Sequence, residues 1–381
     1  MSMDHRRRSR ALVAAALSAA LAAALIPGVA AADSQVTVVA TGLDNPRGLA
    51  FAPNGELYVA EAGRGGAGPC FDGPEGEACF GTTGAIARVD GGTVERVVTG
   101  LPSLAGADGG GAGGPHKLSF LGRGNLYVTI GLGGDLGFRA ALGPAGALAG
   151  TVIRANVDDG SVRIAADLVA HEDPLNPDQG DPGSEVDSNP YGVLATPQGV
   201  YATDAGGNDL LFTDRRGRTQ TVAVFHATMV DAPPFLGLPP GAKMPMQAVP
   251  TGVAQGADGA LYVSQLTGFP FPVGGSSIWR VQPGSAPTVF ATGFTNVVDI
   301  AAGPDGSLYV VEIAKHGLLA GFGSGDFGGR LVRVAPDGTS TTLLENPLFA
   351  PGGVAVGRDG AIYVTNVSVA AGGGQILRIN P

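Results

Sequence analysis

One pattern of polar and hydrophobic positions recurs six times along the chain. Each copy has a short turn rich in glycine, proline or aspartate, followed by apolar residues around a tyrosine. The copies lie at 52–61, 121–130, 195–204, 256–265, 303–312 and 357–366. Six of the seven tyrosines take the same place in them: Tyr58, Tyr127, Tyr201, Tyr262, Tyr309 and Tyr363. The pattern therefore predicts six structural repeats.

Each repeat contains the signals for four strands. A Pro-Asp-Gly or Asn-Gly turn followed by Leu-Tyr-Val predicts a tight hairpin that leads into a second strand. Apolar runs before the turns predict first strands at 48–51, 117–120, 192–195, 252–255, 299–302 and 353–356. Third strands are predicted at 86–89, 151–157, 210–213, 278–281, 331–334 and 376–379. Fourth strands are predicted at 94–101, 161–168, 219–225, 288–294 and 340–346.

The sixth repeat ends at Pro381 without a fourth strand, and the missing strand stands at the other end of the chain. Residues 36–43 (VTVVATGL) closely match the fourth strand at 94–101 (VERVVTGL). This complementarity predicts an all-β, six-bladed β-propeller with four-stranded blades, closed by the N-terminal strand. A linear solenoid would leave the matching ends unexplained. We expect one propeller domain over residues 33–381.

Several longer phrases carry a resemblance to known families. The repeats resemble NHL-type propeller repeats. The phrases DNPRGLAFAPNG, PYGVLA, DAPPFLGLPPG, QLTGFPFP and EIAKHGLL resemble the ScyD/ScyE family of exported bacterial proteins, over essentially all of residues 33–381. The resemblance implies a propeller fold and export, but no particular chemistry.

The N-terminal segment predicts that the protein is exported. Four arginines at positions 6, 7, 8 and 10 precede an apolar run at 11–26, and small residues follow up to Ala32. This order is typical of a secretory signal peptide, here residues 1–32, with cleavage before Asp33. The alternative is an uncleaved membrane anchor, because the run is close to spanning length. We expect a secreted protein that is free of the membrane after cleavage.

The net charge indicates which classes of partner are expected, and the cysteines predict a disulfide. The formal net charge is -10, which disfavours nucleic acid and anionic lipid. A small molecule or an extracellular protein is the expected partner, and the protein is expected to be a monomer. The only two cysteines, Cys70 and Cys79, lie in one Gly-rich loop, where an oxidising compartment favours a disulfide.

Loop lengths predict which face of the propeller carries a site. Connections between first and second strands and between third and fourth strands are short turns. The others, on the opposite face, are long and lie at 61–83, 101–114, 130–149, 168–189, 226–249, 265–276 and 312–328. Because functional loops cluster on rigid scaffolds, we expect any site on this face, over the central channel.

Two rings of side chains are expected at this channel mouth. The residues that open the first strands are Arg47, His116, Tyr191, Thr251, Val298 and Gly352. The residues at the ends of the second strands are Glu61, Ile130, Asp204, Gln265, Glu312 and Asn366. We expect Arg47, His116 and Tyr191 to stand side by side above Glu61 and Asp204, where they would suit an anionic or hydroxylated ligand. The alternative is an internal salt-bridge network that plugs the ring.

A metal site is a further hypothesis for the second ring. Glu61, Asp204 and Glu312 could together hold Ca²⁺ or another divalent cation, or they could simply cap backbone groups. The loop at 171–189 holds six acidic residues whose spacing does not fit an EF-hand, so a solvated acidic loop is the plainer interpretation. Phe235, Phe269 and Phe271 lie among prolines in two long loops and could form a ligand or partner surface.

These features leave two main hypotheses of function. The first is an exported propeller that binds a small ligand or a protein partner through its long-loop face. The alternative is a metal-dependent hydrolase that resembles gluconolactonase-type propellers, acting on a lactone or ester. A quinone-dependent sugar dehydrogenase is a weaker third option. The sequence shows neither a Gly-x-Ser-x-Gly elbow nor a legible Ser-His-Asp arrangement.

Overall fold

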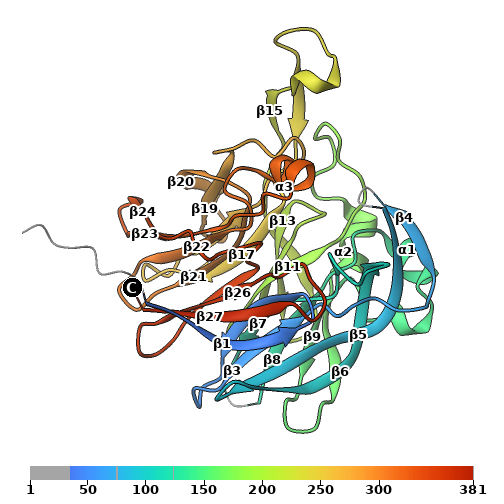
Figure 1. Cartoon of the computed structure of the whole chain (residues 1–381). Helices are drawn as coiled ribbons and strands as arrows, with labels where there is room; N and C mark the ends of the chain where they lie inside the picture. Colours follow the sequence, from blue (N-terminus) through green and yellow to red (C-terminus); the bar gives the residue numbers. More distant parts are fainter. Residues whose placement is uncertain (1–34, 74–75, 123, 381) are drawn as a thin grey trace, which may run out of the picture. The chain divides into compact units, whose positions relative to one another are not determined.

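Six four-stranded antiparallel sheets form the blades of a β-propeller (Figure 1). The computed structural model describes residues 35–73, 76–122 and 124–380. Within these residues the all-β, six-bladed prediction is confirmed. The predicted signal peptide, residues 1–32, lies outside the described residues.

Five blades use consecutive segments of the chain. Blade 1 contains β2 (Pro46–Phe51), β3 (Leu57–Glu61), β5 (Gly76–Asp90) and β6 (Thr93–Gly106). Blade 2 contains β7 (Pro115–Phe120), β8 (Leu126–Ile130), β9 (Thr151–Ala155) and β10 (Val162–Asp167). Blade 3 contains β11 (Pro190–Ala195), β12 (Gly199–Asp204), β13 (Asp209–Asp214) and β14 (Thr219–Val224).

The next two blades repeat this order. Blade 4 contains β17 (Pro250–Gln255), β18 (Leu261–Gln265), β19 (Ser276–Val281) and β20 (Thr288–Phe294). Blade 5 contains β21 (Val297–Ala302), β22 (Leu308–Glu312), β23 (Arg330–Val334) and β24 (Ser340–Leu344).

Blade 6 is assembled from both ends of the chain. It contains β25 (Gly353–Val356), β26 (Ile362–Asn366), β27 (Gly374–Asn380) and, as its outer strand, β1 (Gln35–Leu43). The ladder between β1 and β27 runs from Gln35 opposite Asn380 to Leu43 opposite Gly374. The predicted closure of the ring by the N-terminal strand is confirmed.

The repeated tyrosines pack between strands and between neighbouring blades. Tyr58 of blade 1 meets Phe120 of blade 2 edge-on, with ring centres 5.1 Å apart. Tyr363 of blade 6 meets Phe51 of blade 1 in the same way at 5.0 Å. The Tyr58 hydroxyl donates to Glu56 of the preceding turn, 3.0 Å away. One residue type thus fills the apolar space between blades and bonds its polar end to the adjoining turn.

The long connections lie together on one face, called here the long-loop face. They carry the short helices α1 (Leu136–Ala141), α2 (Val169–Leu175) and α3 (Leu318–Ser324), and the 3₁₀ turns η1 (Pro144–Gly146) and η2 (Pro234–Leu236). Between blades 3 and 4, β15 (Thr228–Asp231) and β16 (Lys243–Met246) form a hairpin that projects from the ring, called here the arm (Figure 1).

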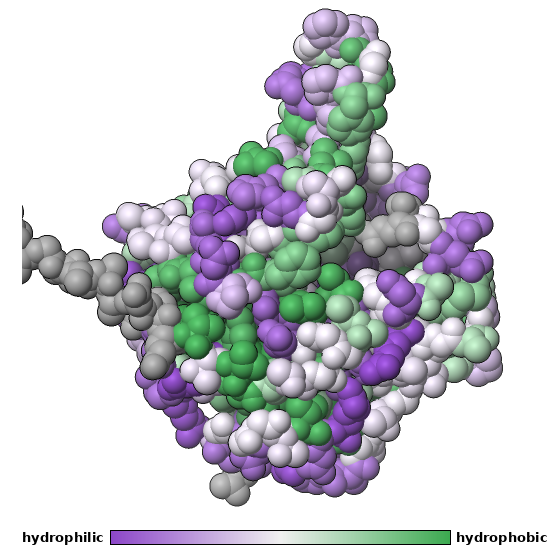
Figure 2. Space-filling model, in the orientation of Figure 1, coloured by the Kyte–Doolittle hydropathy of each residue, from purple (hydrophilic) through white to green (hydrophobic). Residues whose placement is uncertain are grey.

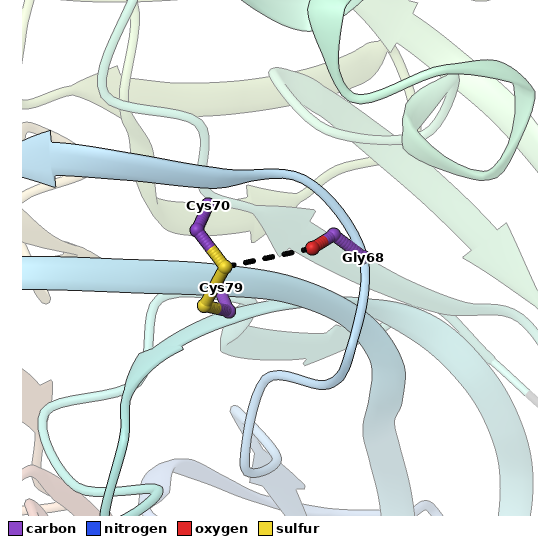
Figure 3. Close-up of a disulfide and its surroundings, with 3 residues drawn as sticks. All are labelled: Gly68, Cys70 and Cys79. Carbon is purple, nitrogen blue, oxygen red and sulfur yellow. Dashed lines mark hydrogen bonds between the residues drawn. A yellow bond between two sulfur atoms is a disulfide. The ribbon is translucent and has the colours of Figure 1, made fainter.

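Part of the long-loop face is more regular than the sequence predicted. The predicted loops at 61–83 and 101–114 contain β4 (Cys70–Gly73), the beginning of β5 and the end of β6, which extend blade 1 as a three-stranded ribbon. Cys70 and Cys79 face each other across β4 and β5 and form the predicted disulfide (Figure 3). The Gly-rich composition concealed these strands, because glycine has low intrinsic strand propensity.

No helix within the described residues is long and apolar enough to cross a membrane.

Removal of residues 36–43 should destroy the cooperative stability of the ring. Without β1, the outer edge of β27 exposes unpaired N–H and C=O groups and the apolar face of blade 6. We expect aggregation at micromolar concentration and loss of a single sharp thermal transition, measured by light scattering and calorimetry. A chain that begins at Ser34 keeps β1 and is the control. A truncated chain that stays monomeric and unfolds cooperatively would contradict the closure.

Candidate functional site

Around the axis, first strands of neighbouring blades contact one another in a closed circle: β2, β7, β11, β17, β21 and β25. The residue that follows each strand-opening residue of the sequence analysis differs between blades. It is glycine in four blades, at positions 48, 192, 252 and 353, but Lys117 in blade 2 and Asp299 in blade 5. These two blades stand opposite each other in a six-membered ring.

Lys117 and Asp299 form an ion pair across the channel. The Lys117 ammonium lies 3.0 Å from Asp299 Oδ2, and the two side chains are 5% and 9% exposed. The ammonium also donates to the Gly352 carbonyl at 2.6 Å, while Asp299 Oδ2 accepts the Val354 N–H at 2.9 Å. A buried ion pair of this kind needs such additional hydrogen bonds to offset desolvation.

Two of these glycines make room for this pair. A Cβ atom at Gly48 would lie 2.8 Å from Lys117 Cδ, and one at Gly252 would lie 2.8 Å from Asp299 Oδ1. Any side chain at either position would collide with the ion pair. The Lys–Asp pair, Gly48 and Gly252 therefore form one steric unit on the axis.

On the short-turn side of the ion pair the channel holds a cavity of about 370 Å³. First strands of all six blades line it, and Lys117 and Asp299 lie at its floor. Most of the wall is aliphatic or small, including Leu49, Val193 and Ile300. The ion pair separates this cavity from the channel mouth on the long-loop face.

At that mouth His116 and Tyr191 lie side by side, as the sequence analysis expected. Their ring centres are 4.6 Å apart. His116 Nδ1 lies 2.9 Å from the Pro190 carbonyl of the next blade, so the neutral imidazole carries its proton on Nδ1 and donates it there. Burial and the Arg47 cation lower the pKa of His116 to about 3.

Arg47 completes the three-blade group at the mouth. One of its terminal nitrogens donates to the Ala112 carbonyl at 2.6 Å, and its buried Nε has no hydrogen-bond partner among the described residues. The backbone of the same segment is held from blade 6, because Thr365 Oγ1 donates to the Arg47 carbonyl at 2.8 Å. Arg47 is thus a fixed cation beside a neutral histidine.

The residues at the second-strand ends bind backbone groups and side chains of their own blades. Glu61 accepts the Asp44 N–H at 2.8 Å, Glu312 accepts the Thr295 N–H at 3.0 Å, and Asn366 accepts the Phe349 N–H at 2.7 Å. All three donors belong to the segments that lead into first strands. The ring therefore caps these loop segments, which was the plainer of the two interpretations.

Two of the three proposed metal ligands are paired with arginines. Glu61 accepts from Arg96 at 2.7 and 2.8 Å, and Glu312 accepts from Arg330 at the same two distances. Burial raises the pKa of Glu312, and Arg330 opposes this shift.

Asp204, the third, accepts from Ser188 and from three backbone N–H groups. The structure does not gather these three carboxylates. Among the described residues, only Cys70, Glu77 and Cys79 bring three potential ligand atoms within 4.8 Å of one another.

A continuous row of aromatic rings crosses the long-loop face. Successive ring centres are 5.8 to 6.5 Å apart, and every contact is edge-on. This phenylalanine row consists of Phe235, Phe269, Phe271, Phe322, Phe327 and Phe349. It begins on the arm, and apolar residues are visible on the arm and around its base in Figure 2.

Comparison with known proteins identifies the fold but no family. No protein-family description matches the chain, and no curated protein sequence matches it. A putative oxidoreductase (glucose dehydrogenase) from Thermus thermophilus is 19% identical, with TM-score 0.55, over 91% of this chain and 100% of that one. A gluconolactonase from Xanthomonas campestris is 12% identical, with TM-score 0.53, over 92% and 91%.

A third similar structure is the PQQ-bound aldose sugar dehydrogenase from Streptomyces coelicolor. It is 14% identical, with TM-score 0.50, over 91% of this chain and 98% of its own. At these identities the similarity shows the shared propeller fold and carries no information about the reaction, because one fold hosts many activities.

The sequence analysis found the mouth residues but missed the ion pair behind them. Arg47, His116 and Tyr191 were expected because they vary at one repeat position. The next position shows a stronger signal, four glycines interrupted by one lysine and one aspartate three repeats apart. Aligning the six repeats at that position would have revealed opposite charges on opposite blades.

Replacing Lys117 by Met should destabilise the protein by about 3–5 kcal/mol, because Asp299 would be left as an uncompensated buried charge. The free energy of unfolding in urea measures the loss. The double variant Lys117→Met/Asp299→Asn removes both charges and should recover most of it. A single variant as stable as the wild type would show that the pair does not hold the axis together.

Acid should destabilise the fold through His116. Its pKa is lowered from 6.5 to about 3, so its stabilising contribution is complete above pH 6.5 and falls as the pH drops toward 3. The wild type should lose about 3 kcal/mol more than His116→Gln between pH 7 and 4.5. Urea unfolding at both pH values measures the difference, with the exposed His226→Gln as control. Equal losses in wild type and His116→Gln would refute the assignment.

Proposed function

We propose that this protein is an exported propeller that binds a ligand or extracellular partner with an apolar surface through its long-loop face. The phenylalanine row carries this proposal. Four of its members remain substantially exposed, Phe235 at 67%, Phe322 at 54%, Phe349 at 43% and Phe269 at 36%. Contiguous exposed aromatic side chains are costly in water and are common at binding surfaces.

The arm enlarges this apolar surface. Leu236 and Leu238, next to Phe235, are 40% and 50% exposed, and Met229 on β15 is 51% exposed. Proline residues on both sides stiffen the loop, so less conformational entropy is lost when it binds. These features support recognition by shape and apolar contact rather than by a charged pocket.

Export is part of the same proposal. It rests on the signal-peptide pattern at 1–32, and the disulfide between Cys70 and Cys79 is consistent with an oxidising compartment. The resemblance to the exported ScyD/ScyE proteins agrees with this location. We therefore place the binding surface outside the cell.

A lactone-hydrolysing mechanism is less well supported. It would need carboxylates that converge on one cation at the channel mouth. Glu61 and Glu312 are instead neutralised by Arg96 and Arg330, each within its own blade. His116, the nearest candidate base, bonds a backbone carbonyl and is buried.

The test uses the fluorescent apolar probe 8-anilino-1-naphthalenesulfonate. The wild type should bind it with a blue-shifted, enhanced emission, and the double variant Phe235→Ser/Phe322→Ser should bind it at least about threefold more weakly. Both side chains are exposed, so the variant should keep the wild-type unfolding temperature. Probe affinity from fluorescence titration is the measurement.

Val289→Ser is the matched control, because Val289 is 50% exposed on β20 and lies outside the row. It should bind the probe as the wild type does. Unchanged binding by the double variant would place the probe elsewhere, for example in the central cavity, and would refute the row as the binding surface.

A further inference from the structure

Blade 3 differs from blade 5 in the charges at the end of its second strand and the start of its third strand. In blade 5, Glu312 at the end of β22 stands opposite Arg330 at the start of β23, and the two form an ion pair. At the equivalent position of blade 3, Asp204 at the end of β12 stands opposite Asp209 at the start of β13. An aspartate thus replaces the arginine that neutralises the carboxylate.

The preceding long connection adds more carboxylates at the same place. Glu172 comes from α2, and Asp178 and Asp187 come from the loop that follows it. The turn between β12 and β13 packs tightly on two of them. A Cβ at Gly207 would lie 2.8 Å from Glu172 Oε2, and one at Gly206 would lie 2.7 Å from Asp187 Cγ. We call Glu172, Asp178, Asp187 and Asp209 the blade 3 carboxylates.

Six of the eight oxygens of these carboxylates are buried and have no hydrogen-bond partner among the described residues. Glu172 and Asp209 are both 0% exposed, and neither oxygen of either group has a hydrogen-bond partner among the described residues. One oxygen of Asp178 and one of the partly buried Asp187 also lack a partner, while the other Asp178 oxygen accepts from Asn208 Nδ2 at 2.9 Å. A buried carboxylate without a donor is strongly unfavourable, so such atoms are rare unless another ligand satisfies them.

No arginine or lysine of the described residues forms a salt bridge with any blade 3 carboxylate within 4.0 Å. Burial and the neighbouring carboxylates raise the pKa of Glu172 to about 8 and that of Asp187 to about 6. Burial, and then the neighbouring carboxylates, raise the pKa of Asp209 well above its usual value. The cluster therefore favours any cation that can enter it.

Asp204 differs from the blade 3 carboxylates because its oxygens already have hydrogen-bond donors. Its oxygens already accept hydrogen bonds from Ser188 Oγ and from the N–H groups of Asn189, Gly206 and Gly207. These bonds fix the turn that carries Gly206 and Gly207 against Glu172 and Asp187. Asp204 thus shapes the cluster while the unpartnered oxygens of the other four remain available.

We propose that blade 3 binds one Ca²⁺ ion through the blade 3 carboxylates. All the available donors are oxygens, with no cysteine or histidine nitrogen among them, which suits a hard cation. The oxygens of three of these carboxylates are not all within 4.8 Å of one another. Ca²⁺ tolerates irregular coordination by six to eight oxygens, including water and backbone carbonyls, and would draw the side chains inward.

The cation would neutralise the blade 3 carboxylates as Arg330 neutralises Glu312. It would tie α2 and the loop at 176–189 to the β12–β13 turn, and so fix part of the long-loop face. This site shares no residue with the phenylalanine row, so the two proposals can be tested independently. The competing explanation for the unpartnered oxygens is that several of these carboxyl groups are protonated and form hydrogen bonds with one another.

The test measures Ca²⁺ binding by the intact protein after treatment with the chelator EGTA. Elemental analysis after equilibration with Ca²⁺ and dialysis should find one ion per chain. Calorimetric scans should show a rise in Tm of roughly 4 °C when Ca²⁺ is present at about 100 times its dissociation constant. Mg²⁺ at the same concentration should have a much smaller effect, because it demands a compact octahedral site.

Two variants decide the assignment. Glu172→Gln and Glu172→Gln/Asp209→Asn should lose the Ca²⁺ response while unfolding in EGTA at or above the temperature of the wild type, because like-charge repulsion is reduced. Glu185→Gln, an exposed acid in the same loop, is the matched control and should keep the full response. A wild type that neither binds Ca²⁺ nor shifts at millimolar concentrations, or variants that respond normally, would overturn the proposal.

Discussion

The pairing of β1 with β27 is the interaction on which the rest of the molecule depends. A propeller has no core of its own outside the contacts between blades, so each blade is stable only if its neighbours are in place. By joining the two ends of the chain in one sheet, this ladder fixes the sixth blade and with it the circle of first strands. Everything at the axis requires that circle to be closed.

Where the first strands meet at the axis, there is little room for side chains. Six first strands meet there, and Gly48 and Gly252 leave room for an ion pair between opposite blades. The pair lies between a cavity lined by the first strands on one side and a mouth with Arg47, His116 and Tyr191 on the other. The mouth and the cavity are therefore two separate places where a ligand could bind. The exposed phenylalanine row belongs to neither of them.

One repeat position illustrates how a shared fold supports different chemistry. The end of the second strand is placed to bind the backbone that enters the first strand, so an acidic or amide residue is useful there in most blades. Its remaining charge is neutralised locally, by Arg96 in blade 1 and by Arg330 in blade 5. Blade 3 lacks such an arginine and gathers further carboxylates instead, which is why we assign it a cation.

The sequence by itself determined the strands, their order, the closure of the ring and the disulfide. These follow from local signals: turns with glycine at positive φ, apolar runs of strand length, and two ends that complete each other. The cysteines were assignable because only two exist and both lie in one hairpin. The long-loop face was also predictable, because loop length alone fixes which connections lie on it.

Only the tertiary structure decided which charged groups meet. Arg96 and Glu61 are 35 residues apart, and Lys117 and Asp299 belong to opposite blades. The hydrophobic pattern determines which face of a strand is buried, but not the radial position of a side chain or its direction across the ring. Those depend on how six twisted sheets pack around one axis. The assembled propeller therefore decides which charged side chains form ion pairs, which are buried and which carboxylate oxygens lack a hydrogen-bond partner.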